Sequence, residues 1–124
     1  MDLNLIEDPN LIPRPRDQIR VQKLEAVPFV DGRRIRVDIH ITPFAPHDRP
    51  SLQVITTSAD GTEVASMEVV STLQSSIRLT VHLRQPGSTD GTYIIEARLF
   101  YETNQIQHTA ATSITLPNDI TDLA

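Results

Sequence analysis

Two segments of this chain alternate apolar and polar residues without interruption over eight positions each. In residues 35–42 every second residue is Ile or Val, and the residues between them are Arg, Asp, His and Thr; residues 77–84 repeat the pattern. An amphipathic helix would need apolar residues three and four positions apart, whereas a strand with one buried face needs them at every second position. The pattern therefore predicts β-strands, and an all-β chain.

Turn-forming residues divide the chain into a series of short predicted strands. Asp60-Gly61 is typical of a hairpin turn, and the change of parity between Val21 and Leu24 indicates a β-bulge in the first strand. The predicted strands cover residues 19–28, 33–42, 51–57, 62–70, 76–84, 92–102 and 105–116. Residues 16–116 are thus predicted to form the domain, between an extended Pro-containing tail (1–15) and an unstructured tail (117–124).

Composition excludes several classes of protein. The 124 residues include no Cys, so disulfides and zinc-thiolate sites are excluded. A formal net charge of -5 argues against a nucleic-acid-binding protein that is basic over its whole surface. No apolar run approaches the roughly 20 residues of a membrane span, and the acidic N-terminus does not fit a secretory signal. We expect no nucleic-acid partner, no membrane contact, and a cytoplasmic protein unless the chain is a fragment of a secreted one.

The segment from Leu83 to Tyr93 resembles a turn of a known domain family. Its sequence, LRQPGSTDGTY, is similar to the turn between the fifth and sixth strands of fibronectin type III and related immunoglobulin-like domains. The resemblance implies a seven-stranded antiparallel immunoglobulin-like β-sandwich, in which Tyr93 forms a tyrosine corner. The chain has no Trp, and Ile95 stands where antibody-type domains carry a Cys, so a disulfide-bearing immunoglobulin domain is excluded. Such domains are rarely catalytic, which implies a binding or spacer module.

The same resemblance places the first, second and fifth strands in one sheet. The outer face of that sheet would then be basic, with His40 and His82 near the cations and Asp38 as its single acid. The candidate residues for binding an anionic partner are Arg20, Arg36, Arg78 and Arg84. The alternative is an ordinary solvated face whose charges prevent sheets from stacking.

The larger sheet, made of the other four strands, offers a candidate surface for a protein partner. Its outer face would carry Ile55, Ile94 and Phe100, and its last strand would offer Gln105, Gln107 and Thr109 along an edge that can accept an added strand. The alternative is that apolar residues of the N-terminal tail cover this surface. Under either hypothesis we expect Phe100 to be shielded from water.

The chain shows no pattern typical of an enzyme or a metal site. It has no glycine-rich phosphate loop and no nucleophile elbow. Antiparallel pairing should keep His40 and His82 apart, and a transition metal needs several converging ligands. His108 falls in the inward register of the last strand, where we expect a local hydrogen bond. These observations predict no catalytic residues, no metal and no cofactor.

The leading hypothesis is a non-catalytic interaction module that binds a protein partner, or a second copy of itself, through the outer face of the larger sheet. The alternative hypothesis is a ligand-binding module for an anionic polymer or a carbohydrate. Carbohydrate platforms use exposed aromatic side chains, and this chain has only three Phe and two Tyr.

Overall fold

The computed structural model describes residues 12–30, 32–83 and 91–115 of the chain. A 3-10 turn, η2 (Arg16–Gln18), precedes the first strand. The seven strands are β1 (Val21–Pro28), β2 (Arg34–Ile41), β3 (Ser51–Ser58), β4 (Glu63–Val69), β5 (Ser76–His82), β6 (Thr92–Glu102) and β7 (Gln105–Thr115). Each predicted strand is present, and its bounds differ from the prediction by no more than about two residues. The terminal tails, residues 1–11 and 116–124, and Arg84 lie outside the described residues.

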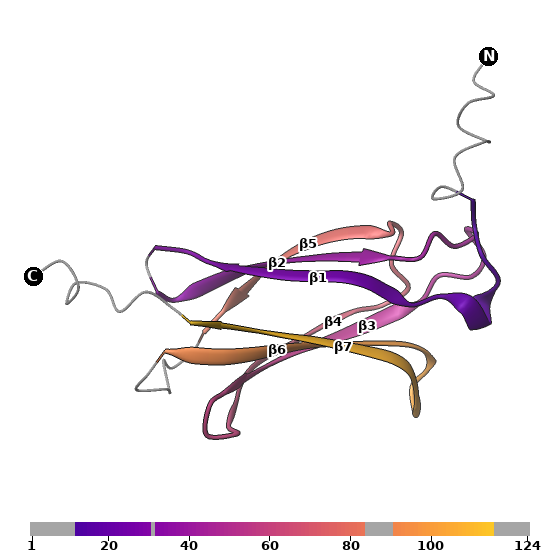
Figure 1. Ribbon diagram of the computed structural model, residues 1–124. Coiled ribbons are helices and arrows are strands. Elements are labelled where there is room, and N and C mark those ends of the chain that lie inside the picture. The colour runs from indigo at the N-terminus through magenta and orange to yellow at the C-terminus, as the bar shows by residue number, and fades with distance from the viewer. Residues whose placement is uncertain (1–11, 31, 84–90, 116–124) are drawn as a thin grey trace, which may run out of the picture.

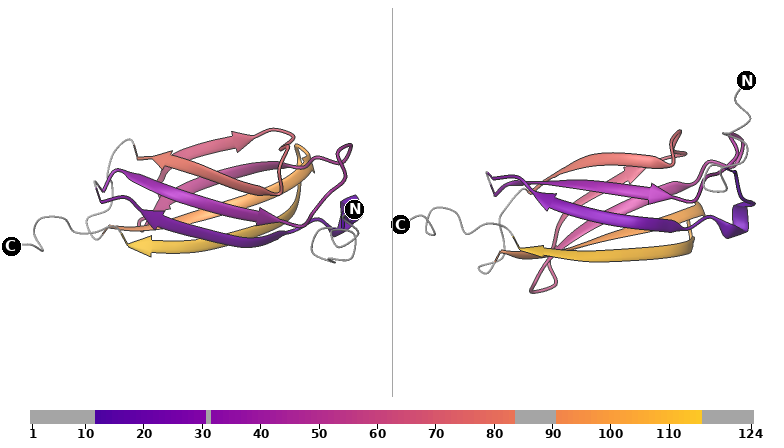
Figure 2. Two further views of the ribbon diagram at one scale, coloured as in Figure 1. Left: turned by 90° about the horizontal axis from the view of Figure 1, so that it is seen from above. Right: turned by 45° about the horizontal axis from the view of Figure 1, so that its top comes forward.

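The strands form two antiparallel sheets that pack face to face (Figure 1). The smaller sheet has the order β1-β2-β5, and the larger sheet has the order β4-β3-β6-β7. The predicted division of the strands between two sheets is therefore confirmed. Figure 2 shows the two layers from two further directions, with the strands running along the long axis of the molecule.

The connections gather at the two ends of the sandwich. At one end lie residues 12–20 and the connections 42–50, 70–75 and 103–104; we call this the N-terminal pole. At the other end, the opposite pole, lie the connections 29–33 and 59–62 and the end of β7.

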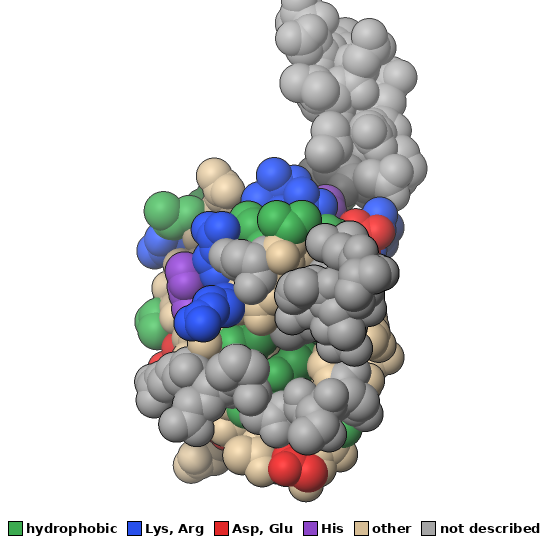
Figure 3. Space-filling model, turned by 90° about the vertical axis from the view of Figure 1, so that its left-hand side faces the viewer, with side chains coloured by type: hydrophobic (Ala, Val, Ile, Leu, Met, Phe, Trp, Pro, Cys, Tyr) green, Lys and Arg blue, Asp and Glu red, His purple; other side chains and the backbone are tan. Residues whose placement is uncertain are grey.

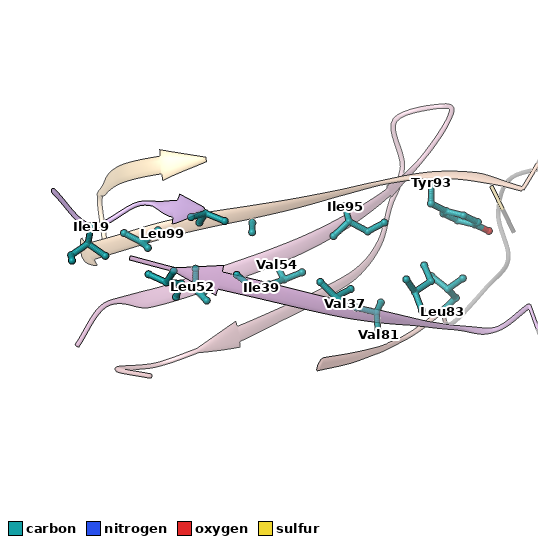
Figure 4. Close-up of a cluster of buried hydrophobic side chains, with 14 residues drawn as sticks. Ile19, Val37, Ile39, Leu52, Val54, Val81, Leu83, Tyr93, Ile95 and Leu99 are labelled. Carbon is teal, nitrogen blue, oxygen red and sulfur yellow. The ribbon is translucent and has the colours of Figure 1, made fainter. Parts of the chain in front are cut away.

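The core lies between the sheets and consists almost entirely of aliphatic side chains (Figure 4). Alternate residues of β2, β3 and β6 point into it, as the two-residue period requires. Tyr93 is the one aromatic residue among the buried members of this cluster, and it is 1% exposed. The partners that a tyrosine corner would use lie in the turn before it, outside the described residues. The buried members are Ile19, Val21, Ile35, Val37, Ile39, Ile41, Leu52, Val54, Val81, Leu83, Tyr93, Ile95, Ala97 and Leu99.

Two local features set the register of the strands. The ladder between β1 and β2 shifts between Val21 and Lys23, which confirms the predicted bulge. The hairpin between β3 and β4 turns at Asp60-Gly61, where Gly61 has a φ of 91° that disfavours any residue with a side chain. The Asp60 carboxylate accepts hydrogen bonds from the Ser58 hydroxyl and from the Thr62 amide, and these bonds hold its pKa below the usual value.

One side of the sandwich is closed where β1 and β7 run side by side, as Figures 1 and 2 both show. The His108 Nδ1 atom on β7 accepts a hydrogen bond from the Val21 amide, with an N–N distance of 3.0 Å. The expectation of a local hydrogen bond for His108 was wrong, because its partner lies 87 residues away in the sequence. A bond between the two sheets cannot be read from the pattern of a single strand.

Thr56 generates a first testable prediction. Its side chain is fully buried on β3, and its hydroxyl has no hydrogen-bond partner among the described residues. A buried, unpaired hydroxyl destabilises the folded state, so Thr56→Val should raise the free energy of unfolding by about 1 kcal/mol. Urea denaturation would measure this as a higher midpoint with an unchanged slope.

The neighbouring Thr57→Val is the matched control. Thr57 pairs with Ile94 on the outer face of the sheet and is partly exposed. Its replacement should change stability by less than about 0.5 kcal/mol. Equal effects of the two substitutions, or a destabilised Thr56→Val, would contradict the assignment of an unpaired hydroxyl.

Candidate interaction surfaces

The outer face of the larger sheet carries the apolar residues proposed for partner binding. Along β3 and β6 the register pairs Ile55 with Glu96 and Ser51 with Phe100. Phe100 is 8% exposed and Ile55 is 9% exposed, so Phe100 is shielded from water as expected. Ile94 is 43% exposed, and it is the apolar candidate that offers most of its surface to a partner.

Polar side chains occupy the middle of this face. The Arg98 Nε atom lies 2.9 Å from Glu96 Oε2, and both side chains are about one third exposed. Beyond them on β7, the register places Thr109 beside Arg98, Ala111 beside Glu96, and Ser113 beside Ile94. These three β7 side chains are small and exposed, so β7 adds little relief to this half of the face.

The edge of β7 is partly used by the chain itself. Gln105 and Thr109 are exposed, but the Gln107 side-chain amide donates to the carbonyl oxygens of Arg16 and Ile19 at 2.9 and 2.8 Å. Residues 16–21 therefore lie against the start of this strand. Strand addition at that part of the edge would have to displace them, whereas a partner on the outer face would not.

The basic candidates on the smaller sheet do not form an unpaired cationic face. Asp38 lies between two of them, with its carboxylate oxygens 2.7 Å from Arg78 Nε and 3.2 Å from Arg36 Nε. The Arg36 Nε atom makes no hydrogen bond in this contact, although it is buried. The Arg20 guanidinium instead donates to the carbonyl oxygens of Asp17 and Ile19 at the N-terminal pole.

Further charges on this face were missed from the sequence. The bulge after Val21 turns Lys23 and Glu25 outward, where Glu25 lies beside Asp38 and Lys23 beside His40. Asp38 is therefore not the single acid of the face. Arg34 continues the row toward the opposite pole and stacks on the ring of Phe29. In Figure 3, Lys and Arg side chains gather along one side of that pole.

The charged pair partners of Asp38 stabilise its ionised form. The hydrogen bond from Arg78 is the largest influence and lowers the pKa of Asp38, and the positive charges of Arg78 and Arg36 lower it further. Partial burial acts in the opposite direction but does not outweigh them. The ionised Asp38 carboxylate therefore links β2 to β5 through its ion pair with Arg78.

No group of three or more His, Asp or Glu side chains among the described residues is arranged to hold a metal ion. His40 pairs with Ser76 and His82 pairs with Arg34, at opposite ends of the same ladder. Within the described ranges there is also no helix whose length and apolar character would let it cross a lipid bilayer.

Comparison with known proteins shows the fold. No protein-family model matches the chain, and no curated protein matches its sequence. In structure it is similar to the chicken interferon gamma receptor alpha chain, with a TM-score of 0.59, 18% identity, and coverage of 79% of this chain and 51% of the receptor chain. The similarity to fibronectin type III and immunoglobulin-like domains inferred from the Leu83–Tyr93 turn is thereby confirmed at the level of fold.

Parts of two much longer enzymes are also similar in structure. The β-glucuronidase of Lactobacillus rhamnosus matches with a TM-score of 0.50 and 20% identity, over 80% of this chain and 16% of the enzyme. The β-glucuronidase of Parabacteroides merdae matches with a TM-score of 0.52 and 14% identity, over 80% of this chain and 14% of the enzyme. The chain spans about half of the receptor chain and a small fraction of each enzyme, and these low identities show a shared fold alone.

Asp38 generates a prediction on acid stability. Because its pKa is lower in the folded chain than its ordinary 3.8, its contribution is present above that value and is lost as the pH falls through the lowered folded-state pKa. Asp38→Asn should therefore be less stable than the wild type at pH 7, and the difference should shrink in strongly acidic solution. Thermal unfolding from pH 7 to pH 2 would measure it. A difference that stays constant over this range would contradict the ion-pair role.

Proposed function

We propose that this chain is a non-catalytic β-sandwich interaction module that binds a protein partner, or a second copy of itself, through the outer face of the larger sheet. The observation that carries the proposal is the half-exposed Ile94 beside a row of small side chains on β7. An exposed aliphatic residue beside small side chains fits another protein surface, because little has to move for the two to pack.

Within this proposal the candidate residues have different roles. Ile94 and Thr109 are accessible and contact the partner directly. Phe100 and Ile55 lie on the same face but are nearly buried, so they contribute little accessible area to the contact. Gln105 lies at the rim, while Gln107 positions residues 16–19. Ile106, which is 44% exposed opposite Phe100, extends the surface toward the N-terminal pole.

The alternative of an anionic polymer has less support. Arg36 and Arg78 already share the Asp38 carboxylate, so an anion would compete with that ion pair for both. The carbohydrate alternative has less support as well, because Tyr93 and Phe100 are buried, Phe44 packs against the core, and arginine side chains lie over the rings of Phe29 and Tyr101. A protein partner on the larger sheet requires no such competition.

The proposal is tested by Ile94→Glu, with Val27→Glu as its matched control. Val27 is 42% exposed on the outer face of the smaller sheet, so the two substitutions add the same charge at the same exposure to opposite faces. Ile94→Glu should weaken the interaction by about tenfold or more, the equivalent of 1.4 kcal/mol. Val27→Glu should bind like the wild type.

Two measurements cover the two kinds of partner. Affinity capture from the native host, followed by a binding titration with the recovered protein, tests a foreign partner. Sedimentation equilibrium tests self-association. Circular dichroism must first show that both variants are folded. Equal losses for the two variants, or unchanged binding by Ile94→Glu, would move the interaction away from the larger sheet.

A further inference from the structure

The connection between β4 and β5 displays two aliphatic side chains to solvent. Val70 is 71% exposed and Leu73 is 77% exposed. The sequence predicts a polar connection over residues 71–75, and the one Leu within it is not part of any alternating pattern of apolar residues. Single exposed apolar residues are common. Val70 and Leu73 differ from such isolated residues because hydrogen bonds hold the backbone that carries them in one conformation.

Hydrogen bonds fasten this connection to the start of β3. The Thr72 amide donates to the carbonyl oxygen of Pro50 at 2.9 Å, and the Ser71 amide donates to the Ser51 hydroxyl at 3.0 Å. Thr72 itself is buried. Ser71 has a φ of 45°, a left-handed conformation that is unfavourable for a residue with a side chain. The connection therefore presents Val70 and Leu73 from a constrained backbone.

A shallow groove with a volume of about 610 Å³ runs beside these residues, between the end of β4 and the start of β5. It combines apolar side chains with cationic ones. Arg49 is exposed and has no hydrogen bond or ion pair to the other described residues, and the Arg78 side chain is 68% exposed although it contacts Asp38. Its principal lining residues are Arg49, Val69, Val70, Leu73, Ile77 and Arg78.

The chain contains a segment of complementary chemistry. Residues 2–8 have the sequence DLNLIED, which joins three aliphatic side chains with three carboxylates. Aliphatic residues match the apolar part of the groove, and carboxylates match the exposed Arg49. The charge match is local, since the whole chain carries a formal net charge of -5.

The path of residues 12–16 leads toward this groove and away from the larger sheet. Arg16 lies against β7 through the Gln107 bond. Going backward along the chain, the Arg14 amide donates to the carbonyl oxygen of Pro43 at 2.9 Å. Pro13 then lines a pocket together with Leu73 and Ser75. The described part of the chain therefore begins near Leu73, and the eleven residues before it can span at most about 40 Å when fully extended.

We propose that residues 2–8 of the same chain bind in the groove between β4 and β5, with their aliphatic side chains on Val70, Leu73 and Ile77 and their carboxylates near Arg49. This intramolecular contact covers the most exposed apolar residues of the N-terminal pole. It uses a surface separate from the outer face of the larger sheet, so either proposal can fail without the other.

Paramagnetic relaxation in the full-length chain tests the contact. The chain has no Cys, so Asn4→Cys provides a single attachment point for a nitroxide label. Amide signals of residues 69–78 should lose intensity most strongly, while Gly61 at the opposite pole and Ala111 on β7 should lose little. Adding Leu73→Glu, which places a negative charge in the groove, should restore the lost intensity. The control Val30→Glu, at an exposed position of the opposite pole, should restore none.

A mixed sample separates this contact from one between two copies. Nitroxide-labelled chain without ¹⁵N is added to unlabelled ¹⁵N chain at the same total concentration, and no residue-specific loss is expected. Loss in the mixed sample would show that a second copy fills the groove, and would overturn the proposal. Loss centred on β6 and β7, or spread evenly over the domain, would overturn it as well. If the amide signals still lost intensity in the Leu73→Glu variant, the proposal would also be overturned.

Discussion

Burial of alternate aliphatic side chains between two sheets is the constraint on which the rest of this structure depends. The chain has no Cys and no Trp, so neither a disulfide nor a central indole holds the layers together. Ile, Val and Leu make up all of the buried core cluster except Tyr93 and Ala97, and most of them come from β2, β3 and β6. Because side chains repeat every two residues along a strand, this inner face also determines which residues reach the outer faces. The packing of the core therefore decides which side chains form the candidate surfaces.

The fold could be predicted because the responsible signals are local. Alternation in residues 35–42 and 77–84, the Asp60-Gly61 turn and the parity change after Val21 each act within a few residues of sequence. The structure shows the corresponding strands, hairpin and bulge. His108 behaves differently, because its hydrogen bond to Val21 depends on how one edge of each sheet approaches the other. No pattern within β7 contains that information.

The candidate surfaces could be predicted only in part, and for the same reason. Ile55 and Phe100 lie outside the core cluster as expected, but the extent of burial of each side chain depends on neighbouring strands and not on its own strand's pattern. The pairing of both Arg36 and Arg78 with Asp38 depends on the register between β2 and β5, which the pattern of one strand does not contain. Val70 and Leu73 lie in a connection without any repeating pattern of apolar residues, so the sequence does not single them out. The hydrogen bonds that hold the backbone of this connection become visible only in the structure.

The parallel course of β1 and β7 has a mechanical consequence. β1 begins at the N-terminal pole, and β7 ends at the opposite pole. Tension applied between Arg16 and Thr115 would pull each of these strands along its own axis, past the antiparallel neighbour to which it is hydrogen-bonded. The ladder bonds lie across that direction and share the load, instead of opening one after another. The domain is therefore built to resist stretching along its length, while a force that peels β4 from the edge of its sheet would meet far less resistance.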